Sequence, residues 1–522
     1  MMKLKKLGSV IFDTTIYKLA CICVFMLVPS YVLCYVSKYV SVILLLWGAT
    51  ILFKDLIGQR NMFKQTGSLL LLLFCIGYVI TLILYAKNDI VSTIHVFCWA
   101  IVEFFLLFAI ERQKKMNVEM LAQDLYKINV VVSAVALLSG IASLMVFFTK
   151  TSVIMPDPEG LNAFWSMGII NGRNSGIFNN AIPCGNAMFI GCAAAAYNLV
   201  AGPRRKVAGR IFYGLTFLVS LMVTMTTLTR TYVYGIYVFT FVAAFYGSYQ
   251  HWMKNGKQLK RFAIAVAVAL AVTGACAGLA EAGKWAMVKA VEDVPMNNII
   301  VGVDDFANNP TTPADTEQNI SSTEPDISAI EQDIANKFGL QTDVNLEREE
   351  LDRLPNFLYP RDEIWKVALQ VIPHSPVFGF TSGNRESASV EFGTTDYRVT
   401  RWPTGIPTYH NAYFDIAVSA GLLGLGLILA FLAVQIVRTL RVMFTKRLEV
   451  GQSSIRFALG TAVGYLATHV LISCMLLGVL VFTNVSVCIY FWVIIGYISR
   501  INDIALQDQE RPNFLERLLK KK

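Results

Sequence analysis

The chain has 522 residues, of which 55% are apolar and only 16% are charged. This composition excludes an ordinary soluble globular protein and is typical of a polytopic membrane protein. The net charge is +9, yet residues 281–411 contain 21 acidic and 10 basic side chains, so the rest of the chain is strongly basic. Because these basic residues are scattered between apolar spans, they argue against a nucleic-acid partner.

Twelve apolar segments are long enough to cross a bilayer, since a spanning helix needs about 20 apolar residues. We therefore predict an all-α polytopic membrane protein with about twelve transmembrane helices. The predicted spans cover residues 16–37, 39–57, 68–86, 91–110, 128–149, 183–201, 211–229, 231–250, 262–280, 412–437, 455–475 and 477–499.

The connections between the spans alternate in charge. Every second connection is rich in Lys and Arg, as in residues 204–210 and 254–261, whereas the intervening short connections hold single basic residues such as Lys38, Lys87 and Lys150. Basic loops stay on the cytoplasmic side of a membrane. Both termini are therefore predicted to be cytoplasmic, and twelve spans satisfy that parity.

These spans divide the chain into four parts. Residues 1–280 contain spans one to nine, residues 281–411 form a large external loop domain, residues 412–499 contain the last three spans, and residues 500–522 form a basic cytoplasmic tail. Within the first part, the outer segment 150–182 is semi-polar, aromatic and glycine-rich. We expect it to lie on the membrane surface or to dip into the membrane.

The external loop changes character along its length. Residues 304–330 are rich in Asn, Thr, Pro and acidic residues, which is typical of a mobile segment, and helical patterning returns in 326–354. The pattern is clearest in 361–372, where Arg361 opens a helix and Trp365 follows one turn later. Prolines at 373 and 376 are predicted to end this helix.

Three arginines on the predicted outer side are candidates for holding an anion. Arg230 lies in the turn between spans seven and eight, Arg361 opens the loop helix, and Arg173 lies in the outer segment. Arginine is permanently charged and binds phosphate oxygens with two parallel hydrogen bonds. The alternative for each is that it snorkels to the lipid headgroups or pairs with a loop carboxylate.

His410 directly precedes the tenth predicted span, and Asn411 and Asp415 follow it. A histidine with an ordinary pKa of about 6.5 is suited to act as a general base near neutral pH. The alternative is a structural histidine at the membrane interface. Asp415 either orients or charges His410, or caps the start of the helix.

The sequence contains no Walker loop, no HExxH and no strand-linked GxGxxG, so we predict no metal site and no cofactor. Glu103 lies inside the fourth predicted span. An acidic residue there acts either as a proton-coupling group or as the internal partner of a basic side chain.

Four segments resemble motifs of the O-antigen ligase and polysaccharide polymerase superfamily of bacterial membrane glycosyltransferases. They are NGRNSGIFNNAIPCGNAMF, TLTRTYVYG, RDEIWKVALQVIPHSPVFGFTSGN and YHNAYFDIAVSAGLLGL, and together they extend over about residues 165–435. The order of these motifs and the large outer loop between spans nine and ten fit the family. The chain departs from the family pattern where the second glycine of an expected Gly-x-Gly is displaced, and where the loop carries an acidic insertion.

The resemblance implies a GT-C-like fold in the bacterial cytoplasmic (inner) membrane, with an active site on the outer face. It implies a metal-independent, inverting transfer of a glycan from an undecaprenyl-pyrophosphate donor to a glycan acceptor. His410, Arg230 and Arg361 would be the catalytic residues, and Arg173, Asn411, Trp365 and Asp415 would bind substrate. Membrane lipids, a flippase and a chain-length regulator are the further partners that the resemblance suggests.

The sequence leaves three functions possible: two glycosyltransferases that differ in their acceptor, and a transporter. The leading hypothesis is a polymerase that joins lipid-linked repeat units of an O-antigen, capsule or exopolysaccharide. The alternative is a ligase that moves the glycan to a different acceptor, either a lipid core or a protein. A transporter or flippase is the third reading, which twelve spans and Glu103 permit and the off-centre loop disfavours.

Overall fold

The computed structural model describes residues 10–506 apart from residues 32, 59–60, 86–88, 112–115, 157–163, 171, 203–206, 255–256, 301–360, 447, 451 and 474–479. The stretch 304–330, the helical pattern in 326–354 and the tail beyond 506 lie outside the described residues.

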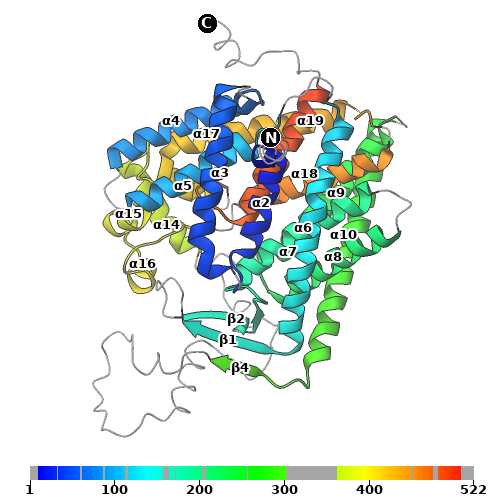
Figure 1. Ribbon diagram of the computed structural model, residues 1–522, viewed down its shortest axis with the longest axis horizontal. Helices are drawn as coiled ribbons and strands as arrows, with labels where there is room; N and C mark the ends of the chain where they lie inside the picture. The colour runs from blue at the N-terminus through cyan, green and yellow to red at the C-terminus, as the bar shows by residue number, and fades with distance from the viewer. Residues whose placement is uncertain are drawn as a thin grey trace, which may run out of the picture.

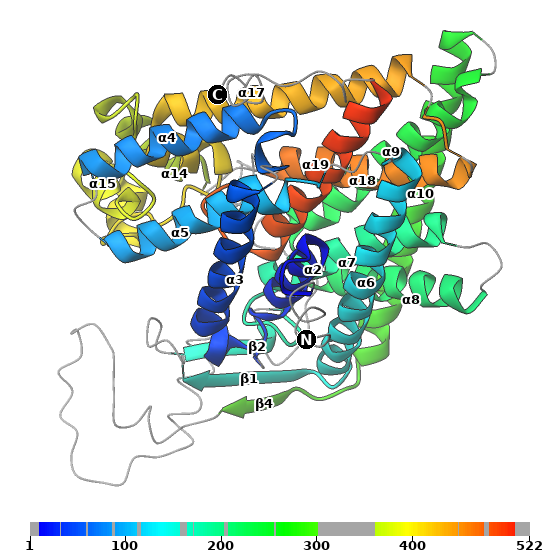
Figure 2. The ribbon, with the colours of Figure 1, turned by 45° about the horizontal axis from the view of Figure 1, so that its top comes forward.

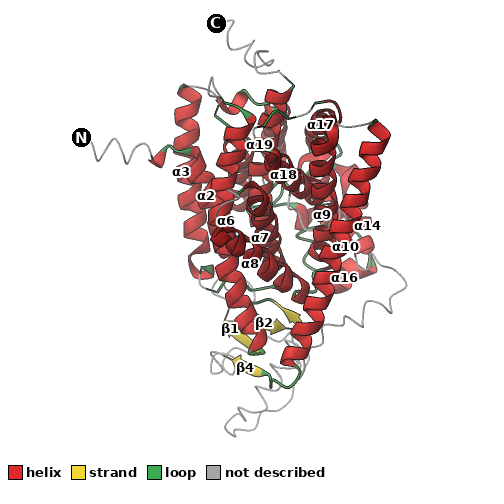
Figure 3. Cartoon of the chain, turned by 90° about the vertical axis from the view of Figure 1, so that its right-hand side faces the viewer, coloured by secondary structure: helices red, strands yellow, loops and turns green. Residues whose placement is uncertain are grey.

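The described chain is a bundle of long helices with a small sheet at one end (Figures 1 and 3). Each of the twelve predicted spans overlaps one helix. These helices are α2 (Thr14–Leu27), α3 (Ser37–Ile57), α4 (Ser68–Tyr85), α5 (Ile90–Val102), α6 (Val118–Phe148), α7 (Ala181–Ala201), α8 (Val207–Thr226), α9 (Arg230–His251), α10 (Gln258–Val291), α17 (Ala412–Thr445), α18 (Ser453–Ile472) and α19 (Ser486–Ala505).

Ten helices in the described part of the chain are long and apolar enough to cross a membrane. The other two that overlap predicted spans are α2, which has 14 residues, and α9, which is rich in tyrosine and glycine. The prediction of an all-α polytopic membrane protein is therefore confirmed. Several helices extend past the predicted bounds: α10 runs on to Val291 and α17 to Thr445, whereas α19 begins at Ser486 rather than at 477.

The sheet distinguishes the two ends of the bundle (Figure 3). We call the end where α6 stops and α7 and α9 start the sheet end, and the other the opposite end. The connection from α2 to α3 also lies at the sheet end, where the Tyr31 N–H donates to the Ile177 carbonyl at 3.1 Å. The start of α2 and the end of α19 therefore share the opposite end.

The sheet end carries a four-stranded sheet in the order β3-β2-β1-β4. Its strands are β1 (Thr151–Pro156), β2 (Phe164–Ile170), β3 (Arg173–Asn174) and β4 (Asn297–Ile300). β1 pairs antiparallel with β2, with Ile154 opposite Ser166, and parallel with β4. These strands were not predicted; residues 150–182 were expected to lie on the membrane surface or to dip into the membrane. The sheet joins that segment to the residues that follow α10.

Close packing of α9 against α18 forms one side of the core. The two helices run antiparallel, and Gly460 and Gly464 of α18 lie where a side chain would meet the carbonyl oxygens of Ala243 and Phe239, at 2.6 and 2.7 Å. Small residues allow such close approach between helices in a membrane. α19 lies inside the bundle, where nearly all of its residues are buried. This framework fixes the start of α9 and the end of α18 at the same level.

α17 runs across one side of the bundle next to α4, which Figure 2 shows. Three short helices of the loop domain lie near its start (Figure 1): α14 (Arg361–Val371), α15 (Arg385–Phe392) and α16 (Asp396–Arg401). Of these, α14 contacts α17, and α15 and α16 pack against α14. The helix predicted from Arg361 is therefore confirmed, and its face with Ile364, Ala368 and Val371 is buried. These residues share an apolar cluster with Ile406, Tyr409 and Val418.

Candidate active site

The first part of the candidate site is the contact between α14 and the residues that precede α17. The indole N–H of Trp365 donates to the carbonyl of Tyr409 at 3.0 Å, and its ring lies 6.0 Å from that of Phe414. Because Tyr409 is the neighbour of His410, this bond ties the loop helix to the histidine. The structure thus gives Trp365 a positioning contact with the backbone of this turn.

His410 itself has an unusual backbone conformation. Its φ is +51°, in the left-handed region that residues other than glycine rarely adopt. Its N–H donates to the Thr408 hydroxyl at 3.4 Å, and its side chain is partly buried. Such strain persists only where the surroundings hold it, and it is concentrated at functional sites.

Two charges act on the imidazole in opposite directions. Burial is the largest influence and lowers the pKa of His410 below its usual value, and the Arg361 guanidinium lowers this pKa further. The Asp415 carboxylate raises the same pKa and offsets part of this effect. Arg361 is therefore close enough to His410 to act on it electrostatically, and both burial and this charge favour the neutral imidazole that a general base requires.

Asp415 makes several of the contacts that hold the turn containing His410. Its carboxylate accepts hydrogen bonds from the Tyr409 N–H at 3.0 Å and from the Thr408 hydroxyl at 3.0 Å. It also pairs with the Arg385 guanidinium at 2.9 Å, and only 2% of the Asp415 side chain is exposed. Asn411 caps α17, because its side-chain oxygen accepts from the N–H groups of Tyr413 and Phe414. Asp415 and Asn411 thus shape the turn, and their predicted contact with substrate stays a prediction.

The second part of the site is the turn between α8 and α9. Arg230 is the first residue of α9, as expected for an arginine at the connection between two spans. Arg173 reaches this turn from β3, where its guanidinium donates to the Thr227 carbonyl at 3.0 Å and to the Thr229 hydroxyl at 3.1 Å. Two of the three predicted outer arginines therefore meet around Thr229.

The end of α18 connects the two parts. The Ala412 N–H, two residues after His410, donates to the Ser473 carbonyl at 2.9 Å. One turn earlier, Thr468 and Ile472 face Gly235 of α9. Arg230 and His410 therefore lie on segments that contact the same end of one helix. The sequence placed both residues on one side of the membrane, and the structure places both segments at the sheet end.

A break in α17 lies one turn and a half after Asp415. Gly421 has φ +68° and ψ −179° inside the helix. The loop before α15 enters this break: the N–H groups of Phe380 and Thr381 donate to the carbonyls of Val418 and Ser419 at 2.8 and 3.0 Å. The Leu422 N–H in turn donates to the Pro376 carbonyl at 2.7 Å. The backbone groups that the break would leave unpaired are thus satisfied by the loop.

A long apolar groove lies below the site, between α9, α10, α17, α18 and α19. It has a volume of about 600 Å³ and is lined by Phe241, Phe245, Phe262, Leu432, Ile436, Leu440, Phe444, Leu466, Ala467, Val470, Leu471 and Ile495, among others. The carbonyl of Val470, one of the lining residues, accepts a hydrogen bond from the Tyr413 hydroxyl at 3.1 Å. The α17 residues that line the groove lie farther along the helix, between Leu432 and Phe444.

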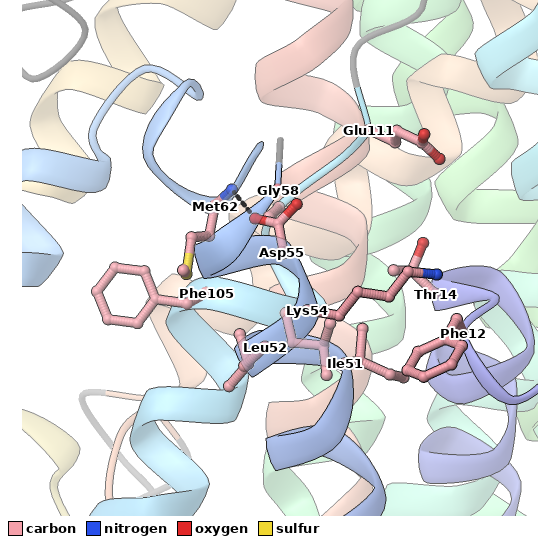
Figure 4. A pocket seen from close by; sticks show the side chains of 12 residues that line it. Phe12, Thr14, Ile51, Leu52, Lys54, Asp55, Gly58, Met62, Phe105 and Glu111 are labelled. Carbon is pink, nitrogen blue, oxygen red and sulfur yellow. Dashed lines mark hydrogen bonds between the residues drawn. The ribbon is translucent and has the colours of Figure 1, made fainter. Parts of the chain in front are cut away.

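A separate hollow lies at the opposite end of the bundle, among residues of α2, α3 and the segment before α6 (Figure 4). There Lys54 extends toward the Phe12 ring, and the Asp55 carboxylate accepts the Met62 N–H at 3.1 Å. Glu103 is buried elsewhere in the core, at the start of a π-helical turn (η3, Glu103–Leu107), and accepts from the Cys488 thiol at 3.3 Å. Neither feature contributes to the site around His410. Among the described residues, no group of three or more His, Cys, Asp or Glu is placed to hold a metal ion.

Arg385 was not predicted from the sequence as a residue of the site. Arg385 lies at the start of α15 and bonds both Asp415 and the Ser382 carbonyl. In the sequence it is one of several basic residues in a polar loop, and its partner is 30 residues away. The displaced glycine pattern, Gly379-Phe380-Thr381-Ser382-Gly383, lies directly before it and was the nearest available signal.

Residues 215–429, from within α8 to within α17, match the family described as O-antigen ligase. Over this stretch the chain is similar to the O-antigen ligase and polymerase superfamily. The match includes Arg230, Arg361, His410 and Asp415, and it ends after the Gly421 break. No curated protein matches the chain. The match and the ten apolar helices together support a multi-pass membrane protein that resembles glycosyltransferases of the O-antigen ligase or polymerase type.

Proposed function

We propose that the protein is a polymerase that transfers a growing glycan from polyprenyl pyrophosphate to a lipid-linked repeat unit. The observation that carries this proposal is the contact between α14, which begins at Arg361, and the turn of His410, which Asp415 holds. The matching family supports the reaction class. Undecaprenyl pyrophosphate is the donor carrier that we infer, because the two arginines at 230 and 361 suit a diphosphate and the groove suits a polyprenyl chain.

The reaction follows from the chemistry of these side chains. The acceptor hydroxyl oxygen attacks the anomeric carbon, and the bond from that carbon to the pyrophosphate oxygen breaks. The hydroxyl proton passes to the neutral imidazole of His410. Polyprenyl pyrophosphate leaves, and Arg361 and Arg230 stabilise the negative charge that builds up on its oxygens. Attack from the face opposite the leaving group inverts the anomeric configuration.

Arg173 supports this reaction through its contact with Thr229, which fixes the turn that presents Arg230. The donor chain would occupy the apolar groove, one of whose lining residues, Val470, contacts Tyr413, three residues after His410. A lipid held there would bring its diphosphate to the level of the α17 start. The arginines would then attract the diphosphate, and the groove would bury the polyprenyl chain of the same donor molecule.

We further infer that the sheet end faces the outside of the cytoplasmic membrane. The helices end at the opposite side with basic residues, among them Lys54 of α3, Arg261 of α10 and Lys446 after α17. Such residues favour the cytoplasmic side. With this orientation both termini are cytoplasmic, and His410 meets donors on the outer face.

A ligase is the second candidate, because the family match carries that description. Purified protein supplied with one lipid-linked repeat unit distinguishes the two functions. A ladder of products that grows by one repeat unit supports the polymerase. Transfer that requires an added second acceptor, with no ladder from the repeat unit alone, identifies a ligase and refutes the polymerase. Absence of transfer in both reactions refutes the proposed glycosyl donor.

A further inference from the structure

The turn that contains His410 is held by a series of hydrogen bonds that starts on α4 and includes the ion pair between Arg385 and Asp415. The Tyr78 hydroxyl donates to the Ser382 hydroxyl at 3.0 Å and accepts the Ser382 N–H at 2.9 Å. The Ser382 carbonyl accepts from Nε of Arg385 at 3.1 Å. A terminal nitrogen of the same guanidinium reaches Asp415 at 2.9 Å. A membrane helix, the start of α15 and the start of α17 are thus joined in one series.

Asp415 connects this series of hydrogen bonds to the turn that contains His410. Its carboxylate receives the Tyr409 N–H and the Thr408 hydroxyl, and that hydroxyl accepts the N–H of His410. These bonds surround the residue with the left-handed backbone. Since strained conformations are retained only when neighbouring contacts over-determine them, the carboxylate must stay in place for the turn to keep its shape.

The environment of Arg385 explains why an arginine is needed. The side chain of Arg385 is 17% exposed and that of Asp415 is 2% exposed, so this carboxylate is removed from water. A buried charge is tolerated when a charged partner and further hydrogen bonds compensate it. Arg385 provides the charge and at the same time bonds the Ser382 carbonyl, which a lysine cannot do with the same planar geometry.

We propose that Arg385 is a positioning residue, which holds the Asp415 carboxylate against the Thr408–His410 turn and thereby fixes the orientation of His410. This inference rests on the proposed role of His410 as the base. Arg385 touches neither donor nor acceptor in this proposal and acts through Asp415. Arg385 also affects the charge felt by the imidazole. Its guanidinium partly neutralises the Asp415 carboxylate, whose effect on His410 is opposite to that of Arg361.

The groups around His410 determine the sign of each variant's effect. Arg361 faces it from α14 and Asp415 from α17, and Tyr409 precedes it. α18, which packs against the α17 start, contributes His469, whose ring stacks on Phe491. In Arg385→Gln the carboxylate keeps its bonds from Tyr409 and Thr408 but loses its cation, so its field raises the pKa of His410. In Asp415→Asn this field is removed, and the pKa falls.

The test is the pH dependence of His410 carbethoxylation by diethyl pyrocarbonate, measured on the purified full-length protein by peptide mass spectrometry. The reagent modifies neutral imidazole, so the midpoint of the modification rate reports the pKa without requiring catalysis. We expect the midpoint to move to higher pH in Arg385→Gln and to lower pH in Asp415→Asn. Midpoints that do not move, or that move in the same direction, overturn the proposal.

A matched control is Arg398→Gln. Arg398, in α16, is also a buried arginine of the loop domain, 8% exposed, but it bonds the Gly393 carbonyl at the end of α15 and not Asp415. Its midpoint should equal that of the wild type. In transfer assays Arg385→Gln should lower kcat at least tenfold and change the donor KM less than threefold, with partial recovery in Arg385→Lys. A rise in KM alone would make Arg385 a substrate ligand and overturn its positioning role.

The two proposals fail differently. If His410→Ala keeps full transfer activity, the base assignment is wrong, while the carbethoxylation midpoints still decide whether Arg385 positions His410. If His410→Ala is inactive and the midpoints of both variants match the wild type, the function stands and the role of Arg385 is refuted.

Discussion

Gly379 and Gly421 approach so closely that a side-chain carbon on Gly379 would lie 2.5 Å from the backbone nitrogen of Gly421. Both have a left-handed backbone, with φ of +71° and +68°. This contact brings the loop after α14 into the break in α17, where the two segments exchange backbone hydrogen bonds. The loop domain is thereby attached to the membrane helix that begins next to His410.

The first prediction concerns this attachment. In Gly421→Ala the new carbon would lie 2.0 Å from the Val377 carbonyl oxygen, with a backbone conformation that alanine rarely adopts. We expect a loss of about 2 kcal/mol or more in stability, because a backbone clash adds to the strain. Thermal unfolding of the purified protein should show a lower Tm.

Gly426→Ala is the matched control in the same helix. No atom lies within 4 Å of a side-chain carbon placed on Gly426. Alanine is favoured over glycine in a helix by up to about 1 kcal/mol, so this variant should be as stable as the wild type or slightly more so. Equal Tm values for the two variants would contradict the role of Gly421.

The second prediction tests His410 as the base. His410→Ala should reduce the rate of glycan transfer by roughly 10²-fold or more, since a positioned general base contributes on that order. Donor binding should remain, because the arginines are unchanged. His374→Ala is the control: this histidine lies in η5 (Ile372–His374) and stacks on Phe392. A fully active His410→Ala variant would refute the assignment.

The third prediction concerns pH. The pKa of His410 is lowered first by burial and then by Arg361, so the imidazole is neutral above this lowered pKa. Transfer activity should therefore fall as the pH drops through that value. In Arg361→Gln the cation is lost, the pKa rises, and the acidic limb of kcat/KM should move to higher pH.

Lys366→Gln serves as the control for the pH profile. Lys366 lies on the same helix, is largely exposed, and pairs with Glu363 rather than with the His410 turn. Its removal should leave the acidic limb in place. A limb that stays fixed in Arg361→Gln, or that shifts to lower pH, would show that Arg361 does not act on the titrating group.

The fourth prediction concerns the turn between α8 and α9. Arg230→Gln should raise the KM for a pyrophosphate-linked donor by roughly 10-fold or more, because a hydrogen bond to a charged group contributes about 1.5–3 kcal/mol. Donor affinity can be measured by titration of the purified protein. Arg210→Gln, on the exposed face at the other end of α8, should bind the donor normally. Unchanged affinity in Arg230→Gln would remove this residue from the donor site.

The sequence was sufficient to predict the helices, and it assigned the candidate site residues to one side of the membrane. Apolar length predicted the spans, and loop charge placed Arg230, Arg361 and His410 at one end. Both patterns are local, so they survive without knowledge of the fold. The sheet was not predicted, because its strands are short and β4 comes from a segment more than 100 residues after β1. Only the folded chain brings them together.

Two features of the site could not be predicted for the same reason. Gly421 lies within a continuous apolar stretch that has the composition of an uninterrupted helix, and the segment that fills the break comes from another part of the chain. Arg385 pairs with Asp415 through the tertiary structure alone. Gly421 and Arg385 are both visible in the sequence, but the residues that they contact could be identified only from the fold.

The last prediction tests whether the groove holds the donor chain. Ala467 of α18 lines the groove between α9 and α17, so Ala467→Trp would fill part of its volume. A long polyprenyl chain would then have to leave the groove or bend, and its apolar contact area would decrease. We expect a higher KM for donors with a long polyprenyl chain and a smaller effect for donors with a short chain, measured by transfer assays with both.

Leu270→Trp provides the comparison, because Leu270 of α10 is 60% exposed and is not among the groove residues. It adds the same indole ring at a membrane helix without filling the groove, so both donors should retain their KM. Chain-length dependence is the decisive quantity. A protein damaged in folding by Ala467→Trp would lose activity toward both donors equally, whereas a blocked groove discriminates between them. If the ratio of the two KM values matches the wild type, the polyprenyl chain binds elsewhere.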